Sequence, residues 1–346
     1  MFSREDEMAK FSVGVVGIGD VAKEYIKSFN ANPLAEVKAV VSRDQEKTRG
    51  IIHSWGLQCE VLADFDALVA RSDIDIIVIT SPHHLHNGAA VAAAEAGKHV
   101  VCEKPIGMNY QELCLLRDTV KKENVMFQSG LVLRWNPFVI NLKNLVDSGQ
   151  LGSLFYMEAD YCHELGPWWN GFSWGGQNKS GGPSASLVAG IHAVDLIRYI
   201  CGEVKEVQAY GTWGHRTDFG YKPTYLAALK VENGAVGKTS CSFEIESPYD
   251  MNFIVHGSKG SVRNDRFFIK DLFPGQTGWQ KFTTIMPDSG AVSHHPFKGL
   301  VDDFLQALDE GRSSMLNIDE MFKTHELCMA IDTSIETGKP VTLPLE

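Results

Sequence analysis

The stretch FSVGVVGIGDVA, residues 11–22, decides the fold of the first part of this chain. Its apolar half is typical of a buried strand, and a helical pattern follows it. The pattern between them is G-x-G-x-x-A, in which Gly17 allows a tight turn, Gly19 lets the backbone approach a pyrophosphate and Ala22 lets helix and strand pack closely. A bare match can be an ordinary turn, but this context predicts dinucleotide binding. The predicted phosphate-binding residues are Gly17, Ile18, Gly19, Asp20 and Val21.

Strands and helices alternate through the first third of the chain. Apolar runs at 11–17, 36–42, 74–80, 98–103 and 125–130 predict strands, and the segments 21–31, 45–56, 87–97 and 110–124 predict helices between them. Uniformly apolar strands separated by helices indicate a parallel sheet that is covered on both faces. We therefore expect an α/β dinucleotide-binding (Rossmann) domain over residues 1–128.

The pattern changes after residue 128, where strands follow one another without crossover helices. Residues 153–163 predict a strand, residues 224–246 a hairpin that turns at Asn233-Gly234, and residues 249–265 a second pair that turns at 258–260. Helices are expected at 136–149, at 192–202 and at the end of the chain. Residues 129–346 therefore predict a second, α+β domain with a large, open, mostly antiparallel sheet that binds substrate and forms oligomers.

Composition limits the classes of function. The chain has 346 residues, 44% of them hydrophobic, with a net charge of −11 and seven scattered cysteines without a C-x-x-C pair. Such an acidic chain is a poor partner for nucleic acid, which needs Lys and Arg on its phosphates. No apolar run is long enough to span a bilayer, and the first residues are charged. We expect a cytoplasmic protein without a membrane or nucleic-acid partner.

The end of the second strand bears on the choice of dinucleotide. An acid there bonds the ribose hydroxyls of NAD, but this chain has Ser42 and Arg43, with Asp44 one position later. A hydroxyl and a guanidinium suit the 2′-phosphate of NADP. NADP is the favoured cofactor. In the alternative, Arg43 is solvated and Asp44 binds NAD.

The stretch KHVVCEKPIGMN, residues 98–109, ends a buried strand in Glu103, Lys104 and Pro105. Ligands of doubly wound sheets bind at the carboxyl ends of the strands. A lysine there can exchange a proton with a substrate hydroxyl or carbonyl while hydride moves to or from a nicotinamide ring. An isolated E-K-P would more simply be a surface ion pair followed by a loop proline.

The chain resembles the Gfo/Idh/MocA oxidoreductases, which include glucose–fructose oxidoreductase and inositol dehydrogenases. The resemblance rests on GVVGIGDVA, on ITSPHHLHNGAAVAAAEAGKHVVCEKPIGMN, on GIHAVDLIRYICG and on AIDTSIETGKPVTLP, in family order. It implies hydride transfer between NAD or NADP and a sugar, polyol or sugar derivative, with Lys104 as the catalytic lysine. The cofactor residues that it adds are Ser81, Pro82, His83, His86, Glu103 and Lys104 itself.

A second family motif, approximately D-x-G-x-H-x-x-D, corresponds to residues 188–195. The resemblance assigns His192 to the catalytic or substrate-binding histidine and Asp195 to the later acid. Val188 replaces the first aspartate, and valine can neither bind a hydroxyl nor carry a proton. The preceding SGGPSASL, residues 180–187, is one residue longer than is usual. Lys104 and His192 can still form an acid–base pair, although His192 can also be a helix-start histidine bonded by backbone.

The substrate side is predicted from the irregular stretch 161–183, which is rich in aromatic residues and glycine. Aromatic faces stack on the C–H faces of sugars, so Trp174 is a candidate substrate contact, with His163 as a polar neighbour. These aromatic residues can equally cover the sheet or pack between subunits. The histidines at 83, 84, 86, 294 and 295 lack the partners of a recognised metal site, so no metal is expected.

Three functions stay open at this point. The first is an NAD(P)-dependent dehydrogenase or reductase that uses Lys104 and His192. The second is a glycoside-processing enzyme whose tightly bound cofactor is recycled without net redox, which the absence of the aspartate at Val188 permits. The third is a non-catalytic NADP-binding regulator. By resemblance, the outer face of the second sheet predicts a homodimer or homotetramer.

Overall fold

The computed structural model describes residues 11–177, 183–284 and 295–345, without the side chain of Asp20. The chain forms two compact units. The first comprises the described residues up to Glu103, Cys114–Gly130 and Phe297–Ile318, and the second comprises Lys104–Leu113, Leu131–Pro296 and Asp319–Glu346. The predicted domains, 1–128 and 129–346, differ from these units in three places, at residues 104–113, 129–130 and 297–318. Residues 297–318 pack on the first unit, where Tyr25 meets Phe297 at 5.0 Å between ring centroids, and residues 104–113 belong to the second.

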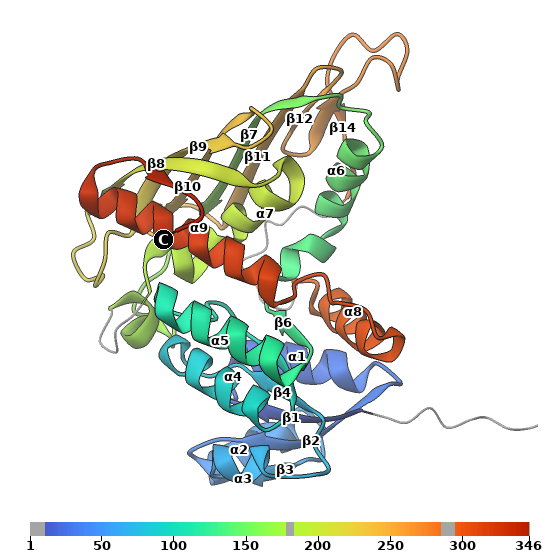
Figure 1. Ribbon diagram of the computed structural model, residues 1–346, viewed down its shortest axis with the longest axis vertical. Helices are drawn as coiled ribbons and strands as arrows, with labels where there is room; N and C mark the ends of the chain where they lie inside the picture. The colour runs from blue at the N-terminus through green and yellow to red at the C-terminus, as the bar shows by residue number, and fades with distance from the viewer. Residues whose placement is uncertain (1–10, 178–182, 285–294, 346) are drawn as a thin grey trace, which may run out of the picture. The chain divides into compact units, whose positions relative to one another are not determined.

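The first unit contains a six-stranded parallel sheet in the order β3-β2-β1-β4-β5-β6. Its strands are β1 (Phe11–Val16), β2 (Ala35–Val41), β3 (Glu60–Leu62), β4 (Ile76–Ile79), β5 (His99–Cys102) and β6 (Phe127–Ser129). Its helical segments are α1 (Asp20–Asn30), α2 (Gln45–Ser54), α3 (Phe65–Val69), η1 (His83–Leu85), α4 (His86–Glu95) and α8 (Phe297–Glu310), with most of α5 (Tyr110–Glu123). Figure 1 shows the helices alongside the strands of this sheet. The predicted Rossmann fold is confirmed.

The second unit is built on a nine-stranded sheet in the order β14-β13-β12-β11-β7-β10-β9-β8-β15. Of its strand pairs, β7 with β10 is parallel and the others are antiparallel, which confirms the predicted mostly antiparallel sheet. The strands are β7 (Leu154–Cys162), β8 (Val204–Thr212), β9 (Thr224–Val231), β10 (Val236–Ser242), β11 (Asp250–Gly257), β12 (Ser261–Arg263), β13 (Arg266–Phe268), β14 (Gln280–Lys281) and β15 (Val341–Thr342).

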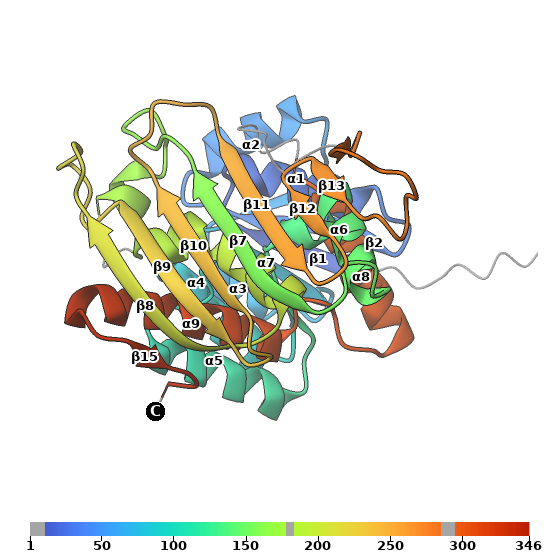
Figure 2. The same ribbon diagram turned by 90° about the horizontal axis from the view of Figure 1, so that it is seen from above.

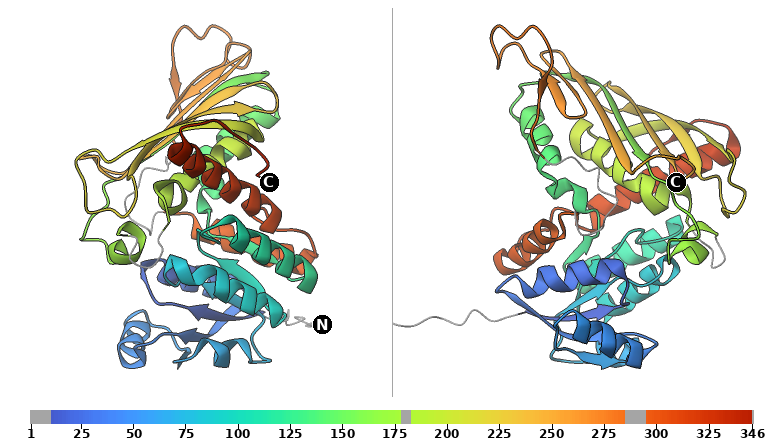
Figure 3. Two further views of the ribbon diagram at one scale, coloured as in Figure 1. Left: turned by 60° about the vertical axis from the view of Figure 1, so that its left-hand side comes forward. Right: turned by 180° about the vertical axis from the view of Figure 1, so that it is seen from behind.

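Helices cover one face of this sheet. They are η2 (Val132–Trp135), α6 (Pro137–Asp147), the π turns η3 (Phe172–Gly176) and η4 (Ser186–Gly190), α7 (Ile191–Cys201) and α9 (Ile318–Thr337). Figure 3 shows α6, α7 and α9 on the same side of the strands, and Figure 2 looks onto the broad opposite face. Burial alternates along β9 and β10, as a sheet with one covered face requires.

Candidate active site

The turn between β1 and α1 requires glycine at its first position. Gly17 has φ +92°, and a Cβ there would lie 2.8 Å from the carbonyl oxygen of Thr80 and 2.9 Å from the nitrogen of Ser81. No other residue could adopt this conformation without strain or fit against the end of β4. The turn therefore lies directly against the carboxyl end of β4.

The start of α1 fits a phosphate group. Gly19 caps the helix without a side-chain hydrogen bond, and a Cβ on Gly19 would meet no atom within 4 Å. The first N–H groups of α1 therefore have no side-chain cap and lie beside open space, which is how a helix N-terminus binds an anion. Ala22 is fully buried against the strand, and Ile18 and Val21 are half-buried beside the turn. The side chain of Asp20 lies outside the described part of the chain.

Ser42 and Arg43 follow β2 as predicted, and Arg43 is exposed. Asp44 has another task, since its carboxylate accepts a hydrogen bond from the backbone nitrogen of Lys47 at 3.0 Å and caps α2. Asp44, the acid that would bind NAD in the alternative interpretation, is therefore engaged as a helix cap.

The end of β4 carries the next group of predicted cofactor residues. The hydroxyl of Ser81 is buried and forms no hydrogen bond to the described residues, so it is a candidate donor to a ligand. His86 Nε2 lies 2.6 Å from the carbonyl oxygen of Ser81, and the rings of His83 and His86 meet edge to face at 5.7 Å. Pro82 caps the 3₁₀ turn η1 that leads into α4.

Glu103 ends β5 with a buried carboxylate. The hydroxyl of Tyr25 in α1 donates to it at 2.9 Å, and Gly130 makes room for it, because a Cβ on Gly130 would lie 2.3 Å from Glu103 Oε1. Burial and the adjacent carboxylate raise the pKa of Tyr25 well above its usual value, so the phenol stays a donor. Glu103 thus links the end of β5 to helix α1.

Lys104 is the next residue after Glu103 and belongs to the second unit, as does His192. Its Nζ donates to the carbonyl oxygen of Val188 at 2.7 Å. Burial lowers the pKa of His192 well below its usual value, and the nearby Lys104 and His295 lower it further. His192 is therefore a neutral imidazole close to a charged lysine, and its Nδ1 is buried without a hydrogen-bond partner among the described residues.

A π turn leads into the helix of His192. Residues 186–190 form it, and α7 continues from it without a break. A π turn holds one residue more than an α turn, which gives the extra residue of this segment a place in the fold. Gly190 is needed there, because a Cβ would lie 2.5 Å from the hydroxyl oxygen of Tyr225. In this chain the lysine contacts the backbone of position 188, where the family motif has an aspartate side chain.

Asp195 is held in a buried ion pair. Its carboxylate accepts from Arg134 at 2.7 and 2.9 Å and from Thr324 at 3.1 Å, and Asp195 and Arg134 are 2% and 3% exposed. The pair connects η2 to α7. The predicted contact of Asp195 with substrate stays a prediction.

Aromatic side chains gather beside His192. The ring of Tyr161 is stacked on that of His192 at 5.9 Å and 17°, and Tyr161 also contacts His163 at 6.3 Å. Tyr249 meets both Tyr161 and His163, and Trp168 meets His163 at 6.2 Å. The structure thus joins the predicted His163 to the predicted His192 through Tyr161.

His163 has a polar atom available to a ligand. Its Nδ1 is buried and makes no hydrogen bond within the described ranges, and burial lowers its pKa. Trp174 lies in the adjacent π turn η3 and packs edge to face on Trp169, with 5.3 Å between the ring centroids. Its ring thus contacts another tryptophan. Its predicted contact with substrate stays a prediction.

Sequence reasoning missed two residues of this region. Tyr161 lies two positions before His163, and residues two apart in an extended segment point to the same face of the sheet. The alternation along β7 could therefore have indicated Tyr161 as a neighbour of His163. Asp332 binds Ser184 and Ser186, and no local pattern in α9 indicates that contact.

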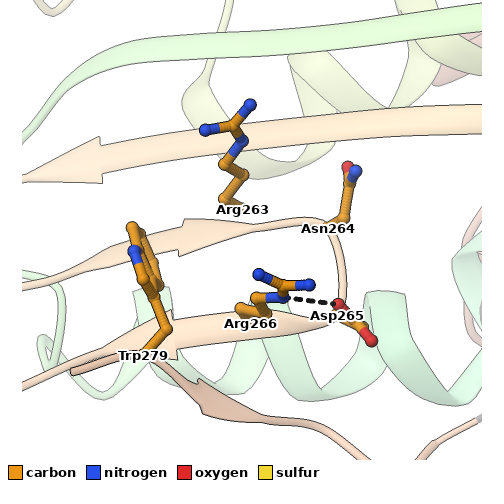
Figure 4. A pocket seen from close by; sticks show the side chains of 5 residues that line it. All are labelled: Arg263, Asn264, Asp265, Arg266 and Trp279. Atoms are coloured by element: carbon orange, nitrogen blue, oxygen red, sulfur yellow. Dashed lines mark ion pairs between the residues drawn. The ribbon is translucent and has the colours of Figure 1, made fainter.

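A separate pocket of about 350 Å³ lies on the hairpin of β12 and β13, and none of the predicted site residues lines it. Figure 4 shows Arg263, Arg266 and Trp279 around it, with the ion pair between Arg266 and Asp265. The side chains of Arg263 and Arg266 are largely exposed. The pocket contains none of the groups that the predicted chemistry needs.

Within the described part of the chain, no group of three His, Cys, Asp or Glu side chains is placed to hold a metal ion. No helix in residues 11–177, 183–284 or 295–345 has both the length and the apolar character that crossing a bilayer requires.

Comparison with known proteins identifies the relatives of this chain. Residues 11–131 match the model of the oxidoreductase family GFO_IDH_MocA, with an NAD-binding Rossmann fold, and residues 139–263 match the GFO/IDH/MocA C-terminal domain. The oxidoreductase YrbE of Bacillus subtilis is 30% identical over 73% of this chain and 73% of its own length. The levoglucosan dehydrogenase of Pseudarthrobacter phenanthrenivorans is 25% identical over 74% of this chain and 73% of its own.

A further relative has a different kind of activity in its name. The 2,7-anhydro-N-acetylneuraminate hydratase of Mediterraneibacter gnavus is 29% identical over 75% of this chain and 68% of its own length. Among solved structures, a levoglucosan dehydrogenase in complex with NADH superposes with a TM-score of 0.87, at 22% identity over 97% of this chain and all of the other. That likeness shows the fold of both units.

Proposed function

Because the chain belongs to the Gfo/Idh/MocA family of NAD-binding oxidoreductases, we propose that it transfers a hydride between a nicotinamide dinucleotide and a sugar, polyol or sugar derivative. One observation carries the proposal most directly. The charged Lys104 lies close to a neutral, buried His192, and His192 is stacked on Tyr161 in an aromatic cluster. A dehydrogenase relative named for a sugar derivative supports the substrate class.

The dinucleotide fits residues at the carboxyl ends of β1, β2 and β4. The backbone at Gly17 and Gly19 would hold the pyrophosphate, Ser42 and Arg43 the ribose and its 2′-phosphate, and Ser81 a polar group of the cofactor. We propose NADP as the preferred cofactor, because Arg43 is exposed at the end of β2 while Asp44 is engaged as the cap of α2. Bound nicotinamide supplies the carbon that accepts or gives the hydride.

Proton movement in the proposed reaction belongs to the second unit. During oxidation of a CH–OH group, the imidazole of His192 takes the hydroxyl proton while the carbon gives up its hydrogen with both bonding electrons, which leaves a carbonyl. Lys104, fixed by its bond to Val188, stabilises the negative charge that develops on the substrate oxygen. A neutral imidazole can accept this proton at pH 7, which is the state that burial and Lys104 favour.

The aromatic cluster supports a substrate with hydroxyl groups on an apolar ring. Tyr161, Tyr249 and Trp168 offer ring faces and edges, and such surfaces pack on the C–H faces of sugars. His163 adds a buried nitrogen without a protein partner in the described ranges. Together they favour a carbohydrate or cyclic polyol.

The proposal is tested by absorbance at the reduced-nicotinamide wavelength with NADP+ and NAD+ in parallel, against inositols, aldoses, sugar acids and glycosides. Lys104→Ala should lower kcat by about a thousandfold, since the charge that develops on the substrate oxygen is no longer stabilised, and should leave dinucleotide affinity within about twofold. Lys98→Ala, on the same segment, is the matched control. Equal turnover by wild type and Lys104→Ala would refute the role of the lysine.

The relative named as a hydratase supports a second candidate function. Such a name describes addition or removal of water, without net oxidation, and Val188 departs from the motif expected of inositol dehydrogenases. In this alternative the cofactor oxidises the substrate transiently and is reduced and reoxidised in one cycle. It predicts NAD(P) recovered from denatured protein, product formation by chromatography and no net absorbance change. Cofactor recovered from the protein, with neither a product nor a net absorbance change, would favour a non-catalytic regulator.

We also propose that the chain forms a homo-oligomer in the cytoplasm. The outer face of the second sheet exposes Phe155, Tyr210, Leu226 and Val236 at 55, 67, 46 and 50%. Exposed apolar groups of this size on one sheet mark a contact surface, and a second copy of the same chain is the proposed partner.

A further inference from the structure

A row of polar groups on α9 faces the helical segment that carries Val188 and His192. Thr324, Cys328 and Asp332 are spaced by four residues and so lie on one face of α9. Thr324 Oγ1 donates to Asp195 at 3.1 Å, and the carbonyl oxygen of Cys328 lies 3.3 Å from Ser186 Oγ. Together with the hydrogen bonds of Asp332, these contacts set the position of η4 and α7 along the axis of α9.

Asp332 binds the entrance of the π turn with both carboxylate oxygens. Ser184 Oγ donates to Oδ2 at 2.5 Å and Ser186 Oγ donates to Oδ1 at 2.9 Å. The backbone nitrogen of Leu187 donates to Ser184 Oγ at 3.3 Å, and that of Val188 donates to the carbonyl oxygen of Ser184 at 2.9 Å. The carboxylate therefore orders Ser184 and Ser186, which lie four and two residues before Val188.

The ordered segment ends in the contact that the proposed chemistry uses. Val188 is two residues beyond Ser186, and its carbonyl oxygen accepts from Lys104 at 2.7 Å. We propose that Asp332 is a positioning residue: through Ser184 and Ser186 it holds the π turn so that the Val188 carbonyl is presented to Lys104. This inference rests on the proposed function of Lys104 and His192. A carboxylate from α9 thereby supports the lysine site in a chain with valine at position 188.

The charge of Asp332 gives the proposal a pH dependence. The pKa of Asp332 is raised to about 7, and burial is the largest cause. The two serine hydroxyls lower this pKa, and Glu336 raises it. The other titratable groups that interact with it are Tyr221, Tyr225 and Cys328, whose pKa values are all raised well above their usual values. These three are neutral at pH 7. The ionised carboxylate accepts from both serines in charge-assisted hydrogen bonds, whereas a protonated carboxyl group is a weaker acceptor and has a hydrogen of its own to donate.

The sign of the pH effect on activity follows. The hold on the π turn is complete only well above pH 7, where Asp332 is fully ionised, and is lost as the pH falls through its pKa of about 7. The pKa of His192 is lowered well below its usual value, so its protonation affects activity at lower pH. The kcat of the wild type should therefore have an acid limb near pH 7 that belongs to Asp332.

The main test is Asp332→Asn, with Asp309→Asn as the matched control at an exposed aspartate of α8. In the variant, kcat should fall about tenfold with KM within about twofold, since only the positioning of Lys104 is weakened. Its acid limb near pH 7 should disappear. A variant with the kcat and the pH profile of the control would overturn the proposal.

Hydrogen exchange of the peptide that covers 184–192 supplies a readout independent of turnover. It should be faster in Asp332→Asn and unchanged in Asp309→Asn. If the wild type turns over no substrate, the proposed function fails while this exchange still decides the role of Asp332. Ser184→Ala combined with Ser186→Ala is the second variant, because it leaves the carboxylate in place. Unchanged exchange in both variants would refute the positioning role.

Discussion

At the scale of single residues, we predict that Arg43 decides between the two dinucleotides. It is exposed directly after β2, and Asp44 beside it is engaged as the cap of α2. Arg43→Ala should lower kcat/KM for NADP about tenfold or more and leave that for NAD nearly unchanged, because a guanidinium–phosphate bond is charge-assisted. The measurement is the ratio of the two kcat/KM values.

Arg49→Ala is the charge-matched control for this prediction, since Arg49 lies on α2 and bonds Gln45. It should leave the cofactor ratio unchanged. Asp44→Ala separates the two interpretations of the strand end. A large, selective loss of NAD turnover in Asp44→Ala would mean that this acid binds the ribose after all, and Arg43 would lose its assigned role.

At the scale of elements, apolar runs predicted most of the long strands because each carries its own pattern, but the nine-residue strand β8 (Val204–Thr212) was not predicted. The strand β3 (Glu60–Leu62) was missed, since three partly exposed residues have no readable alternation. The π turn was also beyond the sequence. It is held by Asp332, 146 to 148 positions away from its serines, and no local rule connects such residues.

The candidate site shows the same division. The positions of Gly17, Gly19 and Lys104 in the fold were predictable because a turn and a strand end constrain them within a few residues. The stacking of Tyr161 on His192 and the pairing of Arg134 with Asp195 depend on how β7, η2 and α7 pack. The motif assigned Asp195 to substrate binding, and the structure shows that Asp195 also has a structural role in its ion pair with Arg134.

The ion pair between η2 and α7 gives a prediction at this scale. Asp195→Ala should lower the free energy of unfolding by about 3 kcal/mol, because it leaves the buried guanidinium of Arg134 with less compensation. Glu320, the second partner at 3.1 Å, limits the loss. Denaturant unfolding followed by fluorescence measures it.

The double variant Arg134→Met with Asp195→Leu should recover most of that stability, since it removes both buried charges. If Asp195 also binds substrate, the double variant will be stable and will have a raised KM. Full stability in Asp195→Ala alone would contradict the structural role of the pair.

At the scale of the whole molecule, the two units interleave along the chain. The predicted single boundary followed the change from alternating helices and strands to strands alone. The return of residues 297–318 to the first unit depends on contacts distant in sequence, such as the hydrogen bond from Asn32 to Asp302 at 2.8 Å. Helix amphipathicity alone cannot say which of two cores a late helix covers.

The uncovered face of the second sheet gives the prediction that belongs to the assembled protein. Leu226 on β9 lies directly opposite Tyr210 on β8, and both side chains are exposed. Leu226→Lys should reduce the mass measured by light scattering to that of one chain, because association would bury an uncompensated ammonium group. Leu272→Lys, at a leucine of similar exposure in the loop after β13, should keep the wild-type mass. If the wild type is itself a single chain at all concentrations, or if Leu226→Lys still associates, this face is not the contact between copies.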